Sequence, residues 1–559
     1  MSDPLVQQLE AIALRLGAAT PPSVQLDRPR NPEHGDLSTN LAMTLARPLG
    51  RPPRVLAEAI IAELDLDAAG LASAEIAGPG FINFRLATDR VRDALVTLLS
   101  ADERYGRHET GAGRSVQVEF VSANPTGPLH VAHGRGAALG DAIASLLEWT
   151  GHRVQREFYV NDAGVQIDRL AESIDARWRE LRGETATIPE GGYHGDYVRA
   201  LAVRAAHAHP GIADLAAGDR VRFLRQWAIT ELRDEQDRDL RDFGVHFDEY
   251  YSETSLYAED KLDDTLAELK HHGLTYEHDG AVWLRTSAYG DDKDRVLVKS
   301  DGSFTYFLPD IAYHRDKVER GFKHVVNVWG ADHHGYAPRM KAALEALGHH
   351  AFLDVEIVQM VRLMRAGQEA KLSKRAGQIV TLRELIDVVG ADVARYFFLM
   401  RRGDAQMLFD LDLALDHSEK NPIFKVQYAH ARMMSIFRKA DIAPNAIDAG
   451  AASLERLTQE SERDLIKQLT QFPGIIERAA GARAPHVVCD YLEATAGQVN
   501  SWYHAGNPSR NPELAVLVAD PELRKARLVL ARAVHIVLRN GLRVLGLTAP
   551  DRMDRGVSE

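Results

Sequence analysis

The sequence predicts a multidomain α/β protein with three parts: a small α/β N-terminal domain, a parallel-sheet domain with insertions, and an all-α C-terminal domain. Three observations lead to this prediction. The 559 residues are too many for a single hydrophobic core. A strand–helix–strand pattern begins at Ser115. From about residue 415 onward, only helical periodicity remains.

Residues 1–108 form the predicted N-terminal domain. Apolar residues recur at helical spacing between Leu5 and Leu16. The segment GPGFINFRL, residues 78–86, indicates a turn and then a strand, with Phe81 and Asn83 on one face. The polar run at 101–114 is the predicted linker to the next domain.

Residues 109–412 form the predicted parallel-sheet domain. VQVEFVSA alternates as a strand does, a helix follows and stops at Gly151, and HRVQREFYVND alternates again. This is a βαβ unit, so we expect a Rossmann-like nucleotide-binding domain. A second half-repeat follows at residues 324–348. Residues 165–300 are predicted to be largely an inserted subdomain, whose charged helix at 221–244 is expected to be solvated and to carry no chemistry.

Local sequence patterns also predict the elements at the end of this domain and the extent of the C-terminal helical domain. VEIVQMVRLM, residues 355–364, predicts one strand, and TLRE at Thr381–Glu384 predicts a capping box that opens a helix. Residues 413–559 are predicted to be α-helical, with a final helix that begins near Pro521.

Composition excludes several classes of protein. The net charge of -13 argues against general affinity for nucleic acid, although a local basic face remains compatible with it. No apolar run reaches the roughly 20 residues that a membrane span needs. The single cysteine, Cys489, excludes an internal disulfide, and the acidic N-terminus is unlike a signal peptide. We therefore expect a cytoplasmic protein.

The stretch SANPTGPLHVAHGRG, residues 122–136, allows two interpretations. His130 and His133 are three residues apart and could share a zinc ion, but no glutamate or cysteine completes such a site nearby. Alternatively, Pro125, Gly127 and Pro128 shape a turn that leads to a helix start, where anions bind. A cationic or hydrogen-bonding imidazole there would stabilise a phosphate, and we favour this interpretation.

A lysine must then supply the positive charge, because the chain has no G-x-x-x-x-G-K-[ST] sequence. Lys371 and Lys374 in KLSKRAG are the candidates. Lysines in a Gly-flanked loop can close over a triphosphate. The plainer alternative is that both lysines belong to a solvated surface.

These segments resemble the signatures of a known enzyme family. HVAH at 130–133 and KLSKR at 371–375 are similar to the HIGH and KMSKS signatures of class I aminoacyl-tRNA synthetases. Further stretches resemble the arginyl-tRNA synthetase family from about residue 30 to 553: HGDLSTNLA, GPGFINF, FYVNDAG, GYHGDYV, DGSFTYFLPDIAYH, WGADHHGY and NPIFKVQYAHAR. The resemblance implies activation of L-arginine with ATP and Mg²⁺, in the presence of tRNA, and its transfer to the terminal adenosine of tRNA(Arg). We expect a monomer.

The resemblance also implies four sets of site residues. Those that act on the ATP phosphates in catalysis are His130, His133, Lys371 and Lys374. Those that hold adenosine are Gly330, Asp332 and His333. Those that hold arginine are Ser122, Asn124, Glu253, Tyr306 and Asp310. Those that touch tRNA are Phe81, Asn83, Gln427, Tyr428 and Arg432. No residue is assigned to a metal site.

Each of these sets has a plainer alternative. Carboxylates match the planar fork of a guanidinium, but Glu253 could be a surface acid and Asp310 a helix N-cap. Phe81 could lie in a buried strand, and Tyr428 could belong to the core. On the final helix, a basic stripe fits backbone phosphates. Its members are Lys525, Arg532, Arg539 and Arg543.

The chain departs from the family pattern at Ala132, Leu372 and Arg375, and it continues past Met553. Two rival functions remain at this stage. One is an adenylating enzyme that uses no RNA, which leaves the helical C-terminal domain without a use. The other is a tRNA-binding relative that has lost catalysis, which both histidines and both lysines disfavour.

Overall fold

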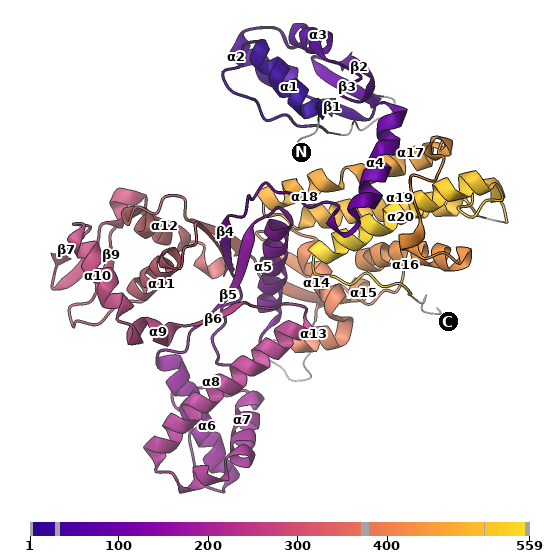
Figure 1. Ribbon diagram of the computed structural model, residues 1–559. Helices are drawn as coiled ribbons and strands as arrows, with labels where there is room; N and C mark the ends of the chain where they lie inside the picture. The colour runs from indigo at the N-terminus through magenta and orange to yellow at the C-terminus, as the bar shows by residue number, and fades with distance from the viewer. Residues whose placement is uncertain (1–3, 28, 30–33, 371–379, 508, 554–559) are drawn as a thin grey trace.

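Figure 1 shows the computed structural model, which describes residues 4–27, 29, 34–370, 380–507 and 509–553. Three groups of elements follow one another along the chain. A small N-terminal domain lies at one end of the molecule and a parallel sheet occupies the middle (Figure 1). The inserted elements extend from the sheet to the left and below in the view of Figure 1, and helices of the C-terminal domain pack on its other side.

The N-terminal domain has its own hydrophobic core of residues between Leu5 and Phe84. Its three strands are antiparallel in the order β1-β3-β2. Phe81 is 40% exposed, whereas Ile82 and Phe84 are fully buried, so the predicted alternation is confirmed for these residues and the buried-strand alternative for Phe81 is wrong. The elements are α1 (Pro4–Arg15), β1 (Leu37–Thr39), α2 (Leu41–Leu49), α3 (Pro53–Glu63), β2 (Leu71–Ala77) and β3 (Phe81–Leu86).

Helix α4 (Thr88–Ala101) connects this domain to the rest of the chain. It packs on α17 (Glu460–Thr470) and α20 (Pro521–Val544). Its residues Leu95, Leu98 and Leu99 belong to the large core that also contains the C-terminal helices. The helix is therefore part of the C-terminal packing rather than of the N-terminal core.

A five-stranded, all-parallel sheet forms the centre, with strand order β11-β10-β4-β5-β6. The chain builds β4, β5 and β6 in one direction, then returns to β4 and builds β10 and β11 in the other. The predicted βαβ unit is confirmed as β4 (Ser115–Glu119), α5 (Val131–Trp149) and β5 (Arg153–Val160). The second half-repeat is confirmed as β10 (His324–Gly330) and α12 (Ala337–Ala346). The other elements of this part are β6 (Glu249–Ser252), α11 (Phe307–Glu319) and β11 (Leu353–Val358).

The region between β5 and β10 differs from the predicted insertion in one respect, because β6 belongs to the main sheet. The inserted elements thus form two separate units. The first has a small core of its own and consists of α6 (Val165–Leu181), α7 (Asp196–Ala208) and α8 (Ala217–Asp242). The second consists of α9 (Glu253–Ala258), α10 (Lys261–His271), β7 (Thr275–His278), β8 (Ala281–Leu284) and β9 (Arg295–Val298).

The solvated interpretation of the charged helix α8 is wrong for one of its faces. Leu224, Ala228, Leu232, Gln236 and Asp239 are buried. Recurrence at three- and four-residue steps is the pattern of a helix with one packed face, here hidden among charges.

A smaller sheet follows, of order β13-β12-β14. Its members are β12 (Val361–Arg365), β13 (Gln368–Glu369) and β14 (Met407–Asp410), so the single strand predicted at 355–364 is divided at Gln359 and Met360. The predicted capping box is confirmed, because Thr381 caps α13 (Leu382–Val389) and the Glu384 side chain accepts from the Thr381 backbone N–H. Helix α14 (Ala391–Leu399) comes next.

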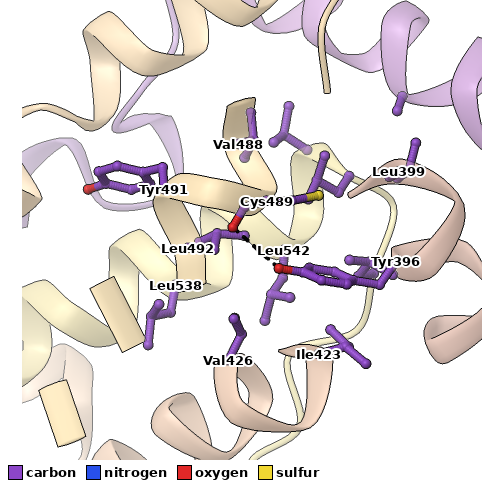
Figure 2. Packing of buried hydrophobic residues seen from close by; sticks show 14 of the residues in the cluster. Tyr396, Leu399, Ile423, Val426, Val488, Cys489, Tyr491, Leu492, Leu538 and Leu542 are labelled. Atoms are coloured by element: carbon purple, nitrogen blue, oxygen red, sulfur yellow. Dashed lines mark hydrogen bonds between the residues drawn. The ribbon is translucent and has the colours of Figure 1, made fainter. Parts of the chain in front are cut away.

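The C-terminal helices share one hydrophobic core with α14 (Figure 2). Tyr396 of α14 points among side chains of three of them and donates its hydroxyl to the Cys489 carbonyl oxygen at 3.3 Å. The remaining elements are α15 (Leu411–Ala414), α16 (Pro422–Ala440), α18 (Phe472–Gly481) and α19 (His486–Ala505). In the part of the chain that the structure describes, no helix combines the length and apolarity that crossing a bilayer requires.

We expect Leu492→Ala to lower the free energy of unfolding by about 3 kcal/mol, because truncation of a buried leucine removes apolar contacts and leaves a cavity. Leu492 is fully buried in this core. Thermal unfolding followed by circular dichroism measures the effect. Leu408→Ala, at a side chain that is 64% exposed, is the matched control. A shift in Leu492→Ala no larger than that of the control would contradict the assignment of this core.

Candidate active site at the carboxyl edge of the parallel sheet

The predicted arginine and adenosine residues gather at the carboxyl edge of the five-stranded sheet. β4 lies between β10 and β5, at the point where the chain reverses the direction in which it adds strands. Such a switch point leaves a crevice outside the strand ends, and ligands of open parallel sheets bind there. Ser122 and Asn124 follow β4, Glu253 follows β6, and Asp332 follows β10.

The backbone directly after β4 is strained. Val121 and Ser122 have φ angles of 68° and 41°, in the left-handed region that L residues rarely adopt. Each such residue costs about 1–3 kcal/mol and persists only where its surroundings enforce it. The Ser122 hydroxyl donates to Glu119 at 3.0 Å and accepts from the backbone N–H of Tyr159 at 3.2 Å. These bonds keep Ser122 turned toward the sheet edge.

His130 and His133 cap the N-terminus of α5 together. His130 is the N-cap residue, and its Nδ1 accepts from the His133 backbone N–H at 3.4 Å. In return, His133 Nδ1 accepts from the His130 backbone N–H at 3.3 Å, and the two rings stack with centroids 3.6 Å apart. Because both Nδ1 atoms accept, the neutral rings carry their protons on Nε2. Two Nε2–H donors therefore stand at a helix start, where negative charge is favoured.

Both imidazoles are held neutral. Burial lowers the pKa of His130, and burial with the nearby His130 ring lowers the pKa of His133 to about 3. The structure thus favours the hydrogen-bonding form of the phosphate interpretation over the cationic one. Among the residues that the structure describes, no group of three or more His, Cys, Asp or Glu side chains could hold a metal ion, so zinc finds no further ligands.

Lys371 and Lys374 lie outside the described residues, but the chain that follows them is anchored at the histidines. The Val131 backbone N–H donates to the Val380 carbonyl oxygen at 3.2 Å. The Leu382 N–H donates to the Leu129 carbonyl oxygen at 2.8 Å. The first described residues after the lysine segment are therefore hydrogen-bonded to the segment that carries His130.

The predicted adenosine residues lie at the carboxyl end of β10. Asp332 Oδ2 and His333 Nε2 lie 3.3 Å apart, and their side chains are 81% and 56% exposed. A Cβ atom at Gly330 would lie 2.5 Å from the Asp332 carboxylate, so a larger residue there would displace this exposed side chain. The edge is open to solvent, as a nucleotide site must be.

The predicted guanidinium pocket is a cluster of carboxylates and tyrosines in which Glu253 is buried and the other members are half-buried. Glu253 is 8% exposed and hydrogen-bonds to Tyr159, and Asp310 accepts from the Tyr336 hydroxyl. Burial, with Glu253 and Glu119 nearby, raises the pKa of Asp310 to about 7, and burial also raises the pKa of Glu253. Buried carboxylates with raised pKa values near each other lack a positive partner. A guanidinium would supply one.

Both plainer alternatives for these carboxylates are wrong. Glu253 is not a surface acid, and Asp310 is not a cap, because the N-cap of α11 is Tyr306. The Tyr306 side chain is 88% exposed, so the structure does not bury it in the pocket.

Sequence reasoning missed the side chains that surround this pocket: Tyr159, Tyr336 and the pair formed by Glu119 and Lys317. Lys317 is fully buried and donates to Glu119 at 2.5 Å. Tyr159 and Tyr336 belong to the stretches FYVND and HHGY, whose resemblance to the family could have marked them as site residues. Glu119 sits in a strand pattern, and nothing marked it as more than a strand residue.

The predicted tRNA residues divide into exposed and internal ones. Phe81 is exposed, and Asn83 is half-buried beside it on β3. Gln427 donates to Asp392 at 2.7 Å and to the Thr548 carbonyl oxygen at 3.0 Å, so its amide N–H groups are already bound to acceptors within the protein.

Arg432 is also internal. Its guanidinium lies 4.7 Å from the Tyr428 ring centroid and 4.5 Å from that of Tyr503, and it donates to Asn500. The Tyr428 ring stacks on that of Phe424, with centroids 5.7 Å apart, and the residue is half-buried. Tyr428 therefore packs on a neighbouring ring and is also partly accessible to solvent.

The predicted basic stripe on α20 has acidic partners within the protein. Arg532 and Arg539 bind Asp102 at 2.9 and 2.5 Å, and Arg543 lies 3.4 Å from Glu103. The phosphate prediction is therefore wrong for Arg532 and Arg539. Their charge attaches α20 to the segment that follows α4.

Models of known protein families match almost the whole chain. Residues 3–86 match the arginyl tRNA synthetase N terminal domain, residues 94–396 the class I tRNA synthetase (R) catalytic domain, and residues 426–553 the DALR anticodon binding domain. The order of these matches is the order of the three structural groups.

Similar proteins extend over the same length. The arginine–tRNA ligase of Geobacillus kaustophilus is 45% identical over 99% of both chains, and that of Syntrophotalea carbinolica is 48% identical over 96% of both. The structure of Thermus thermophilus arginyl-tRNA synthetase superposes with a TM-score of 0.78 at 25% identity, over 99% of this chain and 100% of that one. The chain therefore belongs to the arginine–tRNA ligase family of class I aminoacyl-tRNA synthetases.

Proposed function

We propose that the reaction of this family, the ATP-dependent joining of L-arginine to tRNA(Arg), takes place at the carboxyl edge of the five-stranded sheet. The observation that supports this place most strongly is the pair of carboxylates at the same edge as the N-terminus of α5, in which Glu253 is buried and Asp310 is half-buried. The two carboxylates are suited to a guanidinium, and the helix N-terminus is suited to phosphates.

In the first step, an arginine carboxylate oxygen attacks the α-phosphate of ATP and pyrophosphate leaves. We propose that the Nε2–H groups of His130 and His133 hold the phosphate oxygens, where hydrogen bonds strengthen as charge shifts to the leaving group. Lys371 and Lys374 neutralise the pyrophosphate, and Gly330, Asp332 and His333 hold adenosine. In the second step, the 2′-hydroxyl of the terminal adenosine of tRNA attacks the arginyl carbonyl carbon and AMP leaves.

Mg²⁺ would enter with ATP. The described residues offer no cluster of three acidic or imidazole ligands. A magnesium ion held mainly by phosphate oxygens and water, with few protein ligands, fits such a site. It would supply charge neutralisation of the triphosphate.

Arginine would lie with its α-amino group toward Ser122 and Asn124 and its guanidinium toward Glu253 and Asp310. Tyr306 is proposed to contact the guanidinium at the mouth of the pocket, since it is exposed. Lysine would leave one carboxylate unpaired, because an ammonium is a point charge and a guanidinium is a fork. A buried polar group without its partner discriminates strongly against the wrong substrate.

Three parts of the chain are proposed to share the work: residues 1–108 contact tRNA, 109–412 carry out catalysis and 413–559 bind the anticodon. Phe81 and Asn83 would touch tRNA from the first part. In the third part, Tyr428 would stack on an unpaired base, with the Arg432 guanidinium against its ring, and Gln427 would hold the start of α16 to Asp392. We further propose a cytoplasmic monomer, in line with the single, buried cysteine.

Charging of radiolabelled arginine onto total tRNA tests the function, with lysine and citrulline as competitors. We expect only unlabelled arginine to compete at equal concentration. Pyrophosphate exchange with and without tRNA separates the two steps. Charging of lysine at a comparable rate would contradict the proposed pocket, and exchange that is unaffected by tRNA would contradict the proposed dependence of activation on tRNA.

Arginine binding should depend on pH through Asp310. Its pKa of about 7 means that the carboxyl is neutral below pH 7 and cannot pair with a guanidinium until it loses a proton. We expect the KM for arginine to rise about tenfold for each pH unit below 7 and to level off above it. Calorimetry in buffers of different ionisation enthalpy should show proton release at pH 6. A KM that is constant from pH 5.5 to 8.5 would rule this out.

A further inference from the structure

Three backbone carbonyl groups of the turn before His130 are held by side chains of the inserted helices. Gln236 of α8 donates both Nε2 hydrogens, to the Asn124 carbonyl oxygen at 3.1 Å and to that of Gly127 at 2.9 Å. The Tyr197 hydroxyl of α7 donates to the carbonyl oxygen of Thr126 at 2.7 Å. The turn thus depends for these hydrogen bonds on elements far away in the sequence.

A fourth bond joins the same two regions through side chains. Asn124 Nδ2 donates to Gln166 Oε1 of α6 at 2.8 Å, so α6 and α7 contribute one bond each and α8 contributes two. Gln236 is 2% exposed, and its Oε1 atom is buried without a hydrogen-bond partner. A buried amide oxygen without a partner is costly, so the side chain is kept in place by what its nitrogen binds.

Helix α8 also reaches the segment on the other side of the phosphate site. Asp239 accepts from Arg383 of α13 at 2.8 Å, and Asp242 accepts from the same guanidinium at 2.6 Å. Gln236 and Asp239 are three residues apart and so share one face of α8. This 26-residue helix runs from the lobe of α6 and α7 to α13 (Figure 1).

We propose that the inserted helices are a brace for the active site and that Gln236 is its central positioning residue. The inference rests on the proposed role of the turn and of His130 in holding phosphates. Gln236 touches no substrate in this assignment. It fixes the carbonyls of Asn124 and Gly127, and through them the place of Asn124 and of the α5 N-terminus.

The physical reason lies in the turn itself. Between Asn124 and Gly127 the backbone belongs to no helix or strand, and within the turn itself the Thr126 N–H donates to the Asn124 carbonyl oxygen at 2.8 Å. In the part of the chain that the structure describes, the carbonyl oxygens of Thr126 and Gly127 accept from side chains of α7 and α8 instead. Without the Gln236 donor, the turn would relax toward other partners. A displacement of about 1 Å at a catalytic group can lower a rate about 10²-fold.

Gln236→Met tests this, because methionine keeps the length of the side chain and lacks the donor. We expect kcat/KM for arginine in pyrophosphate exchange to fall 10- to 100-fold. Gln226→Met is the matched control, on the same helix but at an exposed position, and should retain activity. Tyr197→Phe should cause a smaller loss, and the double variant a larger loss than either.

Gln236→Glu separates positioning from a purely structural role. A carboxylate facing two carbonyl oxygens repels them, whereas the protonated acid donates to one again. The activity of this variant relative to wild type should therefore rise as the pH falls from 8.5 to 6.5. For Gln236→Met, the ratio to wild type should stay constant over this range.

The failures can be told apart. If His130→Ala keeps full activity, the proposed role of the turn is wrong, and the brace falls with it. If His130→Ala is inactive while Gln236→Met matches Gln226→Met, only the brace is wrong. A lowered melting temperature of Gln236→Met with unchanged kcat/KM would also overturn the proposal, because Gln236 would then serve stability alone.

Discussion

Asp310→Asn should lower kcat/KM for arginine by about 10²- to 10³-fold, because removing one charge of a buried, hydrogen-bonded pair costs about 2–5 kcal/mol. The loss should appear in the KM for arginine, while the KM for ATP changes little. The asparagine amide would keep an oxygen that accepts from Tyr336, so the pocket retains its shape. Pyrophosphate exchange at pH 8 measures both constants.

The same substitution should not destabilise the protein. The pKa of Asp310 is raised to about 7, above the unfolded value of about 4, so the folded state binds the extra proton between these pH values. Stability therefore falls as pH rises through this window, and at pH 8 the ionised carboxyl opposes folding. We expect Asp310→Asn to melt at the same temperature as wild type at pH 8, or above it.

Asp279→Asn is the matched control, at a side chain that is 89% exposed in the turn between β7 and β8. It should leave both constants and the melting temperature unchanged. If Asp310→Asn raised the KM for arginine and the KM for ATP by the same factor, Asp310 would lie outside the guanidinium pocket.

Periodic segments with strong end signals were predictable from the sequence. The β4–α5–β5 unit has two alternating runs around a helix that stops at Gly151, and the structure contains it. The capping box at Thr381 needed only a local motif. Both signals depend on residues that are close in the sequence, so they can be recognised without knowledge of the tertiary contacts.

The rest depends on contacts between distant residues. β6 is four residues long, too short for a periodic signal, and it joins the main sheet through pairing with β5. The buried face of α8 begins with Leu224, Ala228 and Leu232 but ends with the polar Gln236 and Asp239. Only the partners of these two side chains reveal that they are buried. The prediction that the arginines of α20 bind phosphates also failed because their partner is distant in the sequence. Asp102, which binds Arg532, lies 430 residues away from it.

His130 shows how one residue can carry a structural and a chemical role that substitution can separate. As the N-cap of α5, it satisfies the His133 backbone N–H through Nδ1. As a phosphate ligand, it would offer Nε2–H. Alanine removes both functions, whereas asparagine is a good N-cap with a shorter reach.

We expect His130→Ala to lower the rate of adenylate formation by about 10²- to 10³-fold, as loss of one transition-state donor does elsewhere. It should also lower the melting temperature, because loss of an N-cap costs about 1 kcal/mol. His130→Asn should restore the melting temperature but not the rate. Pyrophosphate exchange and thermal unfolding of the two variants measure these effects side by side.

The neutrality of the imidazoles adds a pH criterion. Burial keeps the pKa values of both histidines below their ordinary value, so neither ring changes charge as the pH rises from 7 to 9. At saturating arginine, which also keeps Asp310 ionised, kcat should then be flat over this range. A kcat that falls with rising pH in wild type, and not in His130→Asn, would mean that a charged imidazole acts on the phosphates. Recovery of the full rate by His130→Asn would instead show that His130 serves only as a helix cap.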